Sequence, residues 1–152
     1  MKLWADSKEN SPGTMVHATI KGQVEKINRQ VLSRGVRAVN AIRNAELEVL
    51  RGQRSGKKYR KPYTKRATYI ASAPGEAPAR RTGNLRLHWT GQVKKEMTTN
   101  NGVRIIAELE SQEKYSGFLE EGTSKMAARP FVERIKKKAQ IEIKKIYHTP
   151  YT

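Results

Sequence analysis

The chain has 152 residues, no cysteine, and a net charge of +17 that arises from 31 Lys and Arg against 14 Asp and Glu. This length fits one domain, but only 36% of the residues are apolar, so we expect a core that is modest or completed by neighbouring subunits. The lack of cysteine excludes disulfides, thiolate nucleophiles and cysteine metal sites. The charge favours an anionic partner, and nucleic acid, an acidic protein surface and anionic lipid all remain open.

The N-terminal third predicts a flexible leader followed by a long helix. Residues 1–18, with Trp4, lack the apolar run of a signal peptide, and nowhere does the chain hold the roughly 18 consecutive apolar residues of a membrane span, so we expect a soluble intracellular product. From Thr19 to Leu50, apolar residues recur at steps of three, four or seven, which predicts one amphipathic helix. Gly35 marks either a bend or a close crossing. The stripe comprises Ile20, Val24, Ile27, Val31, Ala38, Ile42, Ala45 and Val49.

A strongly basic segment follows the predicted helix. Residues 51–66 contain no acid, and glycine, serine and proline break any periodicity, which predicts an exposed loop within a longer basic loop at 51–81. Tyr59, Tyr63 and Tyr69 alternate with the cations, a composition that suits stacking on bases and contact with phosphates. A loop that orders against a protein partner, or a merely solvated loop, fits as well. The cations are Arg51, Arg54, Lys57, Lys58, Arg60, Lys61, Lys65 and Arg66.

The middle of the chain predicts a short helix and a β-hairpin. Thr82 can cap a helix through Leu87, and Trp89 is expected to pack in the core. Strands are expected at about 92–98 and 103–110, joined by a turn at Asn101-Gly102. Apolar residues alternate in the second strand, so one face of the hairpin should pack on the long helix. Further strands could come from the leader or from the residues around Tyr69 and Ile70.

A second helix closes the chain. Pro130 sits where a first helical residue would, and the opposite face of the helix carries lysines that favour solvation. The predicted fold is therefore α+β, with a long N-terminal helix and a C-terminal helix packed on a small antiparallel sheet, in one domain at 19–148 with a tail at 149–152. The apolar stripe of the second helix comprises Phe131, Ile135, Ala139, Ile143 and Ile146.

No pattern in the sequence predicts catalysis. The three histidines lie far apart without the spacing of a metal site, and the neighbouring Glu120 and Glu121 point in different directions on a helix or strand. The segment "GQRSGKK" lacks the spacing and the following Ser or Thr of a phosphate-binding loop. We therefore predict no enzyme activity, no metal and no cofactor.

The stretch "YSGFLEEGTSKMAARPF", residues 115–131, is the most informative part of the chain. Tyr115, Phe118 and Leu119 predict one turn of buried helix, which Gly122 closes in a left-handed conformation. Glu120 is expected to pair with Arg129, and Thr123 to hydrogen-bond within the turn. Met126 and Phe131 are expected to anchor the two ends of the loop in the core.

Together with the upstream "SAPGEAPARRTGNLR" and the long helix, this stretch resembles the small head-tail joining, or tail-completion, proteins of long-tailed bacteriophages. The resemblance covers nearly all of Ile20 to Ile146. It rests on a Glu-x-Gly-Thr-Ser-Lys-Met-x-Ala-Arg-Pro-Phe pattern at 120–131 and an Ala-Pro-Gly-Glu pattern that begins at Ala73. One departure is Glu121, where such proteins often carry an aromatic or apolar residue.

The resemblance implies a non-enzymatic virion protein of the neck or upper tail, assembled in the host cytoplasm. It would form a homo-oligomeric ring, sixfold to match a tail tube, between head-closing proteins and the tail, with no membrane contact. The basic loop would then reach an adjacent ring or the packaged DNA. The residues expected to shape a subunit contact are Tyr115, Phe118, Glu120, Gly122, Thr123, Met126, Arg129 and Phe131.

Two other classes of protein remain as alternatives. A free nucleic-acid-binding module would use the basic loop and its tyrosines, and would bind tightly and with strong salt dependence as a monomer. A small nuclease would need clustered acids to hold metal ions, and the Asp and Glu of this chain are scattered.

Overall fold

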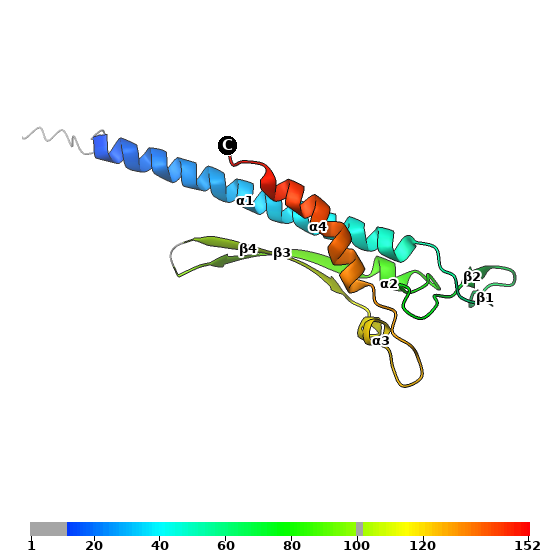
Figure 1. Ribbon diagram of the computed structural model, residues 1–152. Helices are drawn as coiled ribbons and strands as arrows, with labels where there is room; N and C mark the ends of the chain where they lie inside the picture. Colours follow the sequence, from blue (N-terminus) through cyan, green and yellow to red (C-terminus); the bar gives the residue numbers. More distant parts are fainter. Residues whose placement is uncertain (1–11, 100–101) are drawn as a thin grey trace, which may run out of the picture.

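The computed structural model describes residues 12–99 and 102–152, and it has the predicted α+β architecture. Helix α1 (Pro12–Arg51) lies over an antiparallel hairpin of β3 (Trp89–Met97) and β4 (Val103–Ser111). Helix α4 (Val132–His148) lies along the C-terminal half of α1 (Figure 1). None of the helices in these ranges is long and apolar enough to cross a membrane.

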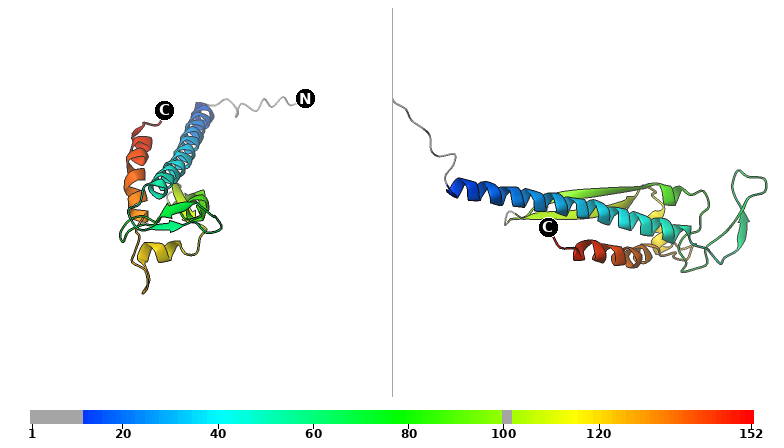
Figure 2. Two further views of the ribbon diagram at one scale, coloured as in Figure 1. Left: turned by 90° about the vertical axis from the view of Figure 1, so that its right-hand side faces the viewer. Right: turned by 90° about the horizontal axis from the view of Figure 1, so that it is seen from above.

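Helix α1 begins earlier than its sequence pattern predicts. Residues 12–18, expected to belong to the flexible leader, are helical, and Pro12 stands at the first helical position, where a missing N–H costs nothing. Residues 1–11, including Trp4, lie outside the described residues. The first turns of α1 extend past the hairpin without packing on it (Figures 1 and 2).

Glycines bring α1 and the hairpin into direct contact. A Cβ atom on Gly35 would lie 2.5 Å from Ile105 Cγ2 and 3.0 Å from Val93 Cγ1, and one on Gly91 would lie 2.5 Å from Val39 Cγ1. Gly35 therefore marks a close crossing, one of the two alternatives that its position in the helix left open. The hairpin packs on α1 as predicted, through the face that carries Val93 and Ile105.

The core lies where α1, α4 and the start of β3 meet. Phe131 is almost completely buried, and the ring of Trp89 packs against it edge to face, with 6.2 Å between the ring centroids. Ile135 and Ala139 of the predicted stripe on α4 are buried beside them. This confirms that Trp89 is a packing residue.

The basic segment contains a second, smaller hairpin. Strands β1 (Lys58–Arg60) and β2 (Thr68–Ile70) pair antiparallel. The segment expected to be a loop therefore contains a small sheet, and the further strand considered near Tyr69 and Ile70 is present as β2. This hairpin projects from the end of the body where α1 ends (Figure 2). Two short helices follow along the chain, α2 (Asn84–Leu87) at its predicted place and α3 (Ser116–Glu121).

The last four described residues, expected to form a tail, lie against α1. The Arg34 guanidinium donates hydrogen bonds to the carbonyls of Thr149 and Pro150, and it stacks 3.6 Å from the centre of the Tyr151 ring. Gln30 exchanges hydrogen bonds with Thr152. These contacts hold the end of the chain beside the middle of α1.

Candidate functional site

Glu120 connects α3 to the start of α4. Its Oε2 atom accepts hydrogen bonds from the backbone N–H groups of Phe131, at 2.8 Å, and Val132, at 3.2 Å. The first N–H groups of a helix have no partner within it, so a carboxylate there supplies both a hydrogen bond and a favourable charge. The predicted pair between Glu120 and Arg129 is therefore wrong, because the carboxylate is used by the backbone of α4.

Arg129 instead connects the two segments that carry the phage resemblance. Its Nη2 atom donates to the Ser72 carbonyl at 3.2 Å, while its backbone N–H donates to the Leu119 carbonyl at 2.8 Å. Close by, the Gly75 N–H donates to the Ala128 carbonyl, and Arg134 donates to the Gly75 carbonyl. Ser72 and Arg129 are 57 residues apart in the sequence, and these hydrogen bonds place the two motifs side by side in the fold.

The middle of the second motif is a tight turn. Gly122 ends α3 with φ 82°, and a Cβ atom there would lie 2.7 Å from the Ala128 nitrogen, so only glycine fits. Thr123 and Met126 exchange backbone hydrogen bonds, and the Thr123 hydroxyl accepts one from the Lys125 N–H. These contacts agree with the predicted end of the helix at Gly122 and with the predicted local bonding of Thr123. The ψ of Gly122 is −179°, so its backbone is not in the left-handed helical conformation that was predicted. Met126 is only half-buried.

Helix α3 is more exposed than predicted. Phe118, expected in the core, is 62% exposed and Tyr115 is 39% exposed, while Leu119 alone of the three packs against the core cluster. A six-residue helix at the edge of a body can bury only one narrow side. Burial and the neighbouring Glu113 carboxylate raise the pKa of the Tyr115 hydroxyl.

The β1–β2 hairpin and its connecting loop, residues 56–71, have two chemically different faces. Tyr59 lies directly opposite Tyr69, with 6.0 Å between the ring centroids, whereas Lys58 and Arg60 alternate with them and point to the other side. Tyr63 in the connecting loop is fully exposed and has a φ of 60°, which is unusual for a residue with a side chain. The cations Lys57, Lys58, Arg60, Lys65 and Arg66 are exposed.

The base of this hairpin is held by an acid and an arginine. Glu76 accepts hydrogen bonds from the Ser55 hydroxyl, the Ser55 N–H and the Ala73 N–H, and these bonds lower the pKa of the Glu76 carboxyl to about 2. Arg54 donates to the carbonyls of Pro78 and Val49. Arg54 is thus occupied within the fold, unlike the other cations expected to face a partner.

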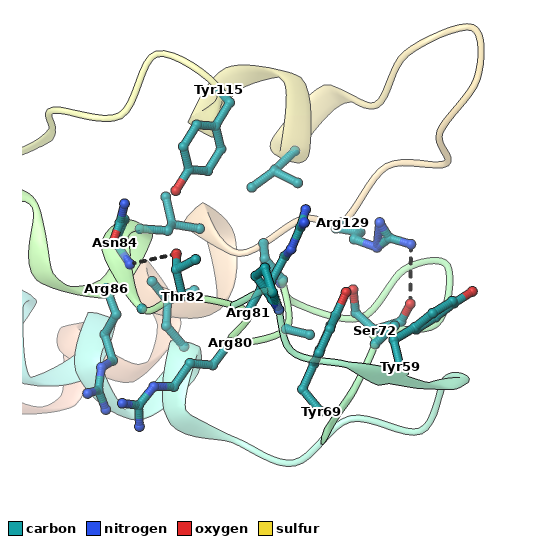
Figure 3. Close-up of a pocket in the computed structure, with 18 of the residues that line it drawn as sticks. Tyr59, Tyr69, Ser72, Arg80, Arg81, Thr82, Asn84, Arg86, Tyr115 and Arg129 are labelled. Carbon is teal, nitrogen blue, oxygen red and sulfur yellow. Dashed lines mark hydrogen bonds between the residues drawn. The ribbon is translucent and has the colours of Figure 1, made fainter. Parts of the chain in front are cut away.

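A groove of about 660 Å³ separates the tyrosine face of the hairpin from α2 and α3. Tyr59 and Tyr69 form one side, and Arg80 and Arg81 line it from the loop before α2 (Figure 3). Tyr115 points into it from the opposite side (Figure 3). Of the residues singled out from the sequence, the structure brings Tyr59, Tyr63, Tyr69, Tyr115 and Arg129 to this one groove.

A buried acid in α1 was not predicted from the sequence. Glu46 is fully buried and forms an ion pair with Arg43, while its Oε1 atom has no hydrogen-bond partner among the described residues. Burial raises the pKa of the Glu46 carboxyl to about 7, against the opposing effect of Arg43. Glu46 falls among apolar positions of the helix stripe, and that placement is the signal that could have identified it.

The remaining ionisable groups form no cluster that suggests chemistry. Within 12–99 and 102–152, no three His, Cys, Asp or Glu side chains come together as a metal site would require. His88 lies 2.5 Å from Glu113 at the surface. No family model, no curated protein and no solved structure matches this chain.

Proposed function

We propose that this protein is a structural component of a bacteriophage neck or upper tail, where it joins head-closing proteins to the tail as a homo-oligomeric ring. The observation that carries the proposal is the contact between the two motifs of the resemblance. Arg129 of the second motif binds the Ser72 carbonyl beside the first, and Glu120 caps the helix that the second motif begins. Because these residues hold one another in place, the two distant segments have a physical reason to occur together in one chain.

The exposed surface suits assembly better than isolation. The hairpin of residues 56–71 projects from the body, and large apolar side chains, including Phe118 and Ile20, are exposed. Exposed apolar surface marks interaction sites in soluble proteins where it is contiguous, as the spacing of Ile20, Val24 and Ile27 along α1 makes it. In the ring, the hairpin reaches the adjacent ring or the DNA that passes through.

Electron microscopy of particles tests this proposal. In cells infected by a phage that encodes this chain, loss of the chain should leave filled heads and complete tails that are not joined. An antibody against the chain should label the neck of intact particles. Joined particles that form without the chain would contradict the proposal.

A free nucleic-acid-binding module is the second candidate, and the exposed cations beside Tyr63 favour it. Replacing Lys58, Arg60, Lys65 and Arg66 by glutamine would then weaken binding of the monomer to duplex DNA and reduce the salt slope by about 0.9 for each phosphate that is no longer neutralised. The matched control is replacement of four exposed lysines outside the hairpin and outside the groove along α4: Lys95, Lys114, Lys144 and Lys145. A ring protein that acts through subunit contacts predicts weak binding and an equal decrease in both variants.

A further inference from the structure

The N-terminal half of α1 carries an apolar stripe that nothing in the described part of the chain covers. Ile20, Val24 and Ile27 are 57%, 49% and 42% exposed, and every described residue from 15 to 27 is exposed. The stripe continues the row that is buried at Ala38 and Ala45. In Figures 1 and 2 the first turns of this half extend beyond the tip of the hairpin. Isolated helices of this length are marginal in water, so we expect a partner to cover it.

The same chain presents an apolar groove on another side. This groove, of about 590 Å³, runs between α4, Trp89 of β3 and Leu109 of β4. Trp89, Leu109 and Ile143 are only half-buried, and Val132 at one end of the groove is exposed. An amphipathic helix can bind in such a groove through apolar residues spaced by four and three, because these residues form a ridge along one side of the helix.

The stripe cannot enter the groove of its own copy. Ile42 of α1 lines this groove, and Val24 is eighteen residues away along the same uninterrupted helix, which corresponds to roughly 27 Å at 1.5 Å per residue. A stripe and a groove at different places on one chain meet only between copies, in a head-to-tail contact. Repeated contacts of this kind generate a ring when the rotation between copies closes.

The charges beside the two surfaces allow this contact. Lys21, Glu25 and Lys26 flank the stripe, and Glu133, Lys136 and Lys137 line the groove, so each surface offers both signs to the other. Pairing of two free helices with each other would close a dimer and leave the groove uncovered. Contact with another copy's groove covers both apolar surfaces at once.

We propose that Ile20, Val24 and Ile27 of each copy bind in the groove between α4 and the β3–β4 hairpin of the next copy. This inference rests on the proposed ring and names the contact that holds it together. It assigns the subunit interface to α1 and α4, in addition to the segment at 115–131.

Cross-linking between single-cysteine variants tests the contact, because the chain has no cysteine of its own. We expect a short bis-maleimide to join Val24→Cys to Gln140→Cys, which lies at the groove, when the two preparations are mixed. Gly22→Cys is the matched control: it lies on the opposite side of α1, and no atom lies within 4 Å of its added Cβ. We expect the cross-link between Gly22→Cys and Gln140→Cys to form in a yield at least fivefold lower than the cross-link between Val24→Cys and Gln140→Cys.

A second variant separates this contact from the ring itself. Ile20→Lys together with Val24→Lys should abolish the ring measured by light scattering and leave the melting temperature of the monomer unchanged, because these side chains are exposed within one copy. A ring that persists in this variant, with no Val24–Gln140 cross-link, would overturn the contact and leave the proposed function standing. Cross-linking of Val24→Cys to itself in preference to Gln140→Cys would also overturn it, in favour of a helix pair. A chain that neither cross-links nor forms a ring at any concentration would count against both proposals.

Discussion

The carboxylate of Glu120 accepts a hydrogen bond of 2.8 Å from the backbone N–H of Phe131, the residue that precedes the first turn of α4. The acid thus connects α3 to the helix that contributes Ile135, Ala139 and Ile146 to the core. Glu120→Ala should lower the free energy of unfolding by about 1–2 kcal/mol, the usual cost of losing a helix cap. Urea denaturation measures this change. Glu121→Ala, one residue along and exposed, is the control and should change stability by less than about 0.5 kcal/mol.

Gly35 and Gly22 lie in the same helix and should respond to alanine in opposite directions. The Cβ of Gly35→Ala would meet Ile105 at 2.5 Å, so the crossing must open, and overpacking of this kind costs about 1–3 kcal/mol. At Gly22 no atom lies within 4 Å of the added Cβ, and alanine should stabilise the helix by about 0.5–1 kcal/mol. Thermal and urea denaturation of both variants check this prediction. A Gly35→Ala variant with unchanged stability would contradict the close packing of α1 on the hairpin.

The hydrogen bonds by which Glu76 fixes the base of the basic hairpin should weaken at acid pH. Its pKa is lowered from 4.5 to about 2 in the fold, so the protein gains stability from this carboxylate above pH 4.5 and loses it as pH falls towards 2. The protection factors of the Ser55 and Ala73 amides, which compare hydrogen exchange with the intrinsic rate at the same pH, should therefore decrease in that window. Glu76→Gln should show fast exchange of both amides already at pH 7. Unchanged protection in this variant would show that other contacts hold the hairpin.

Glu46 should have the opposite effect on the pH dependence of stability. Its folded pKa, raised from 4.5 to about 7, lies above the unfolded value, so the contribution of Glu46 to stability is fully present below pH 4.5 and is lost as pH rises through 7. Glu46→Gln removes this titration and should raise the free energy of unfolding at pH 8 by on the order of 1–3 kcal/mol, the range for an incompletely satisfied buried group. Glu48→Gln, an exposed acid paired with Lys138, is the control. If the free energy of unfolding changed equally with pH in wild type and Glu46→Gln between pH 5 and 8, the predicted titration of Glu46 would be contradicted.

The helices and the main hairpin could be predicted because their signals are local. Apolar spacing located α1 and α4, and strand alternation with an Asn-Gly turn located β3 and β4. Gly35 was ambiguous in sequence, since a crossing and a bend need the same residue. Its neighbours Ile105 and Val93 lie far along the chain and decide the matter only in the fold.

The site was harder to predict because its partners are distant or belong to the backbone. Glu120 has a complementary side chain nearby in Arg129, but two helix N–H groups compete for the same carboxylate and bind it. Arg129 and Arg54 bind backbone carbonyl groups, and because every residue has one, the sequence does not indicate which carbonyl is bound. Phe118 was expected to be buried because it is apolar, and the position of α3 at the edge of the body leaves it exposed.

The most direct test of the proposed function is a joining assay with separated heads and tails. Purified protein is added to an extract in which a phage lacking this chain has assembled heads and tails, and infectious particles are counted. We expect the count to rise with added wild-type protein and to stay at background with Ile20→Lys/Val24→Lys, whose monomer is intact. Heads and tails that join equally well without the protein would contradict its role in the neck.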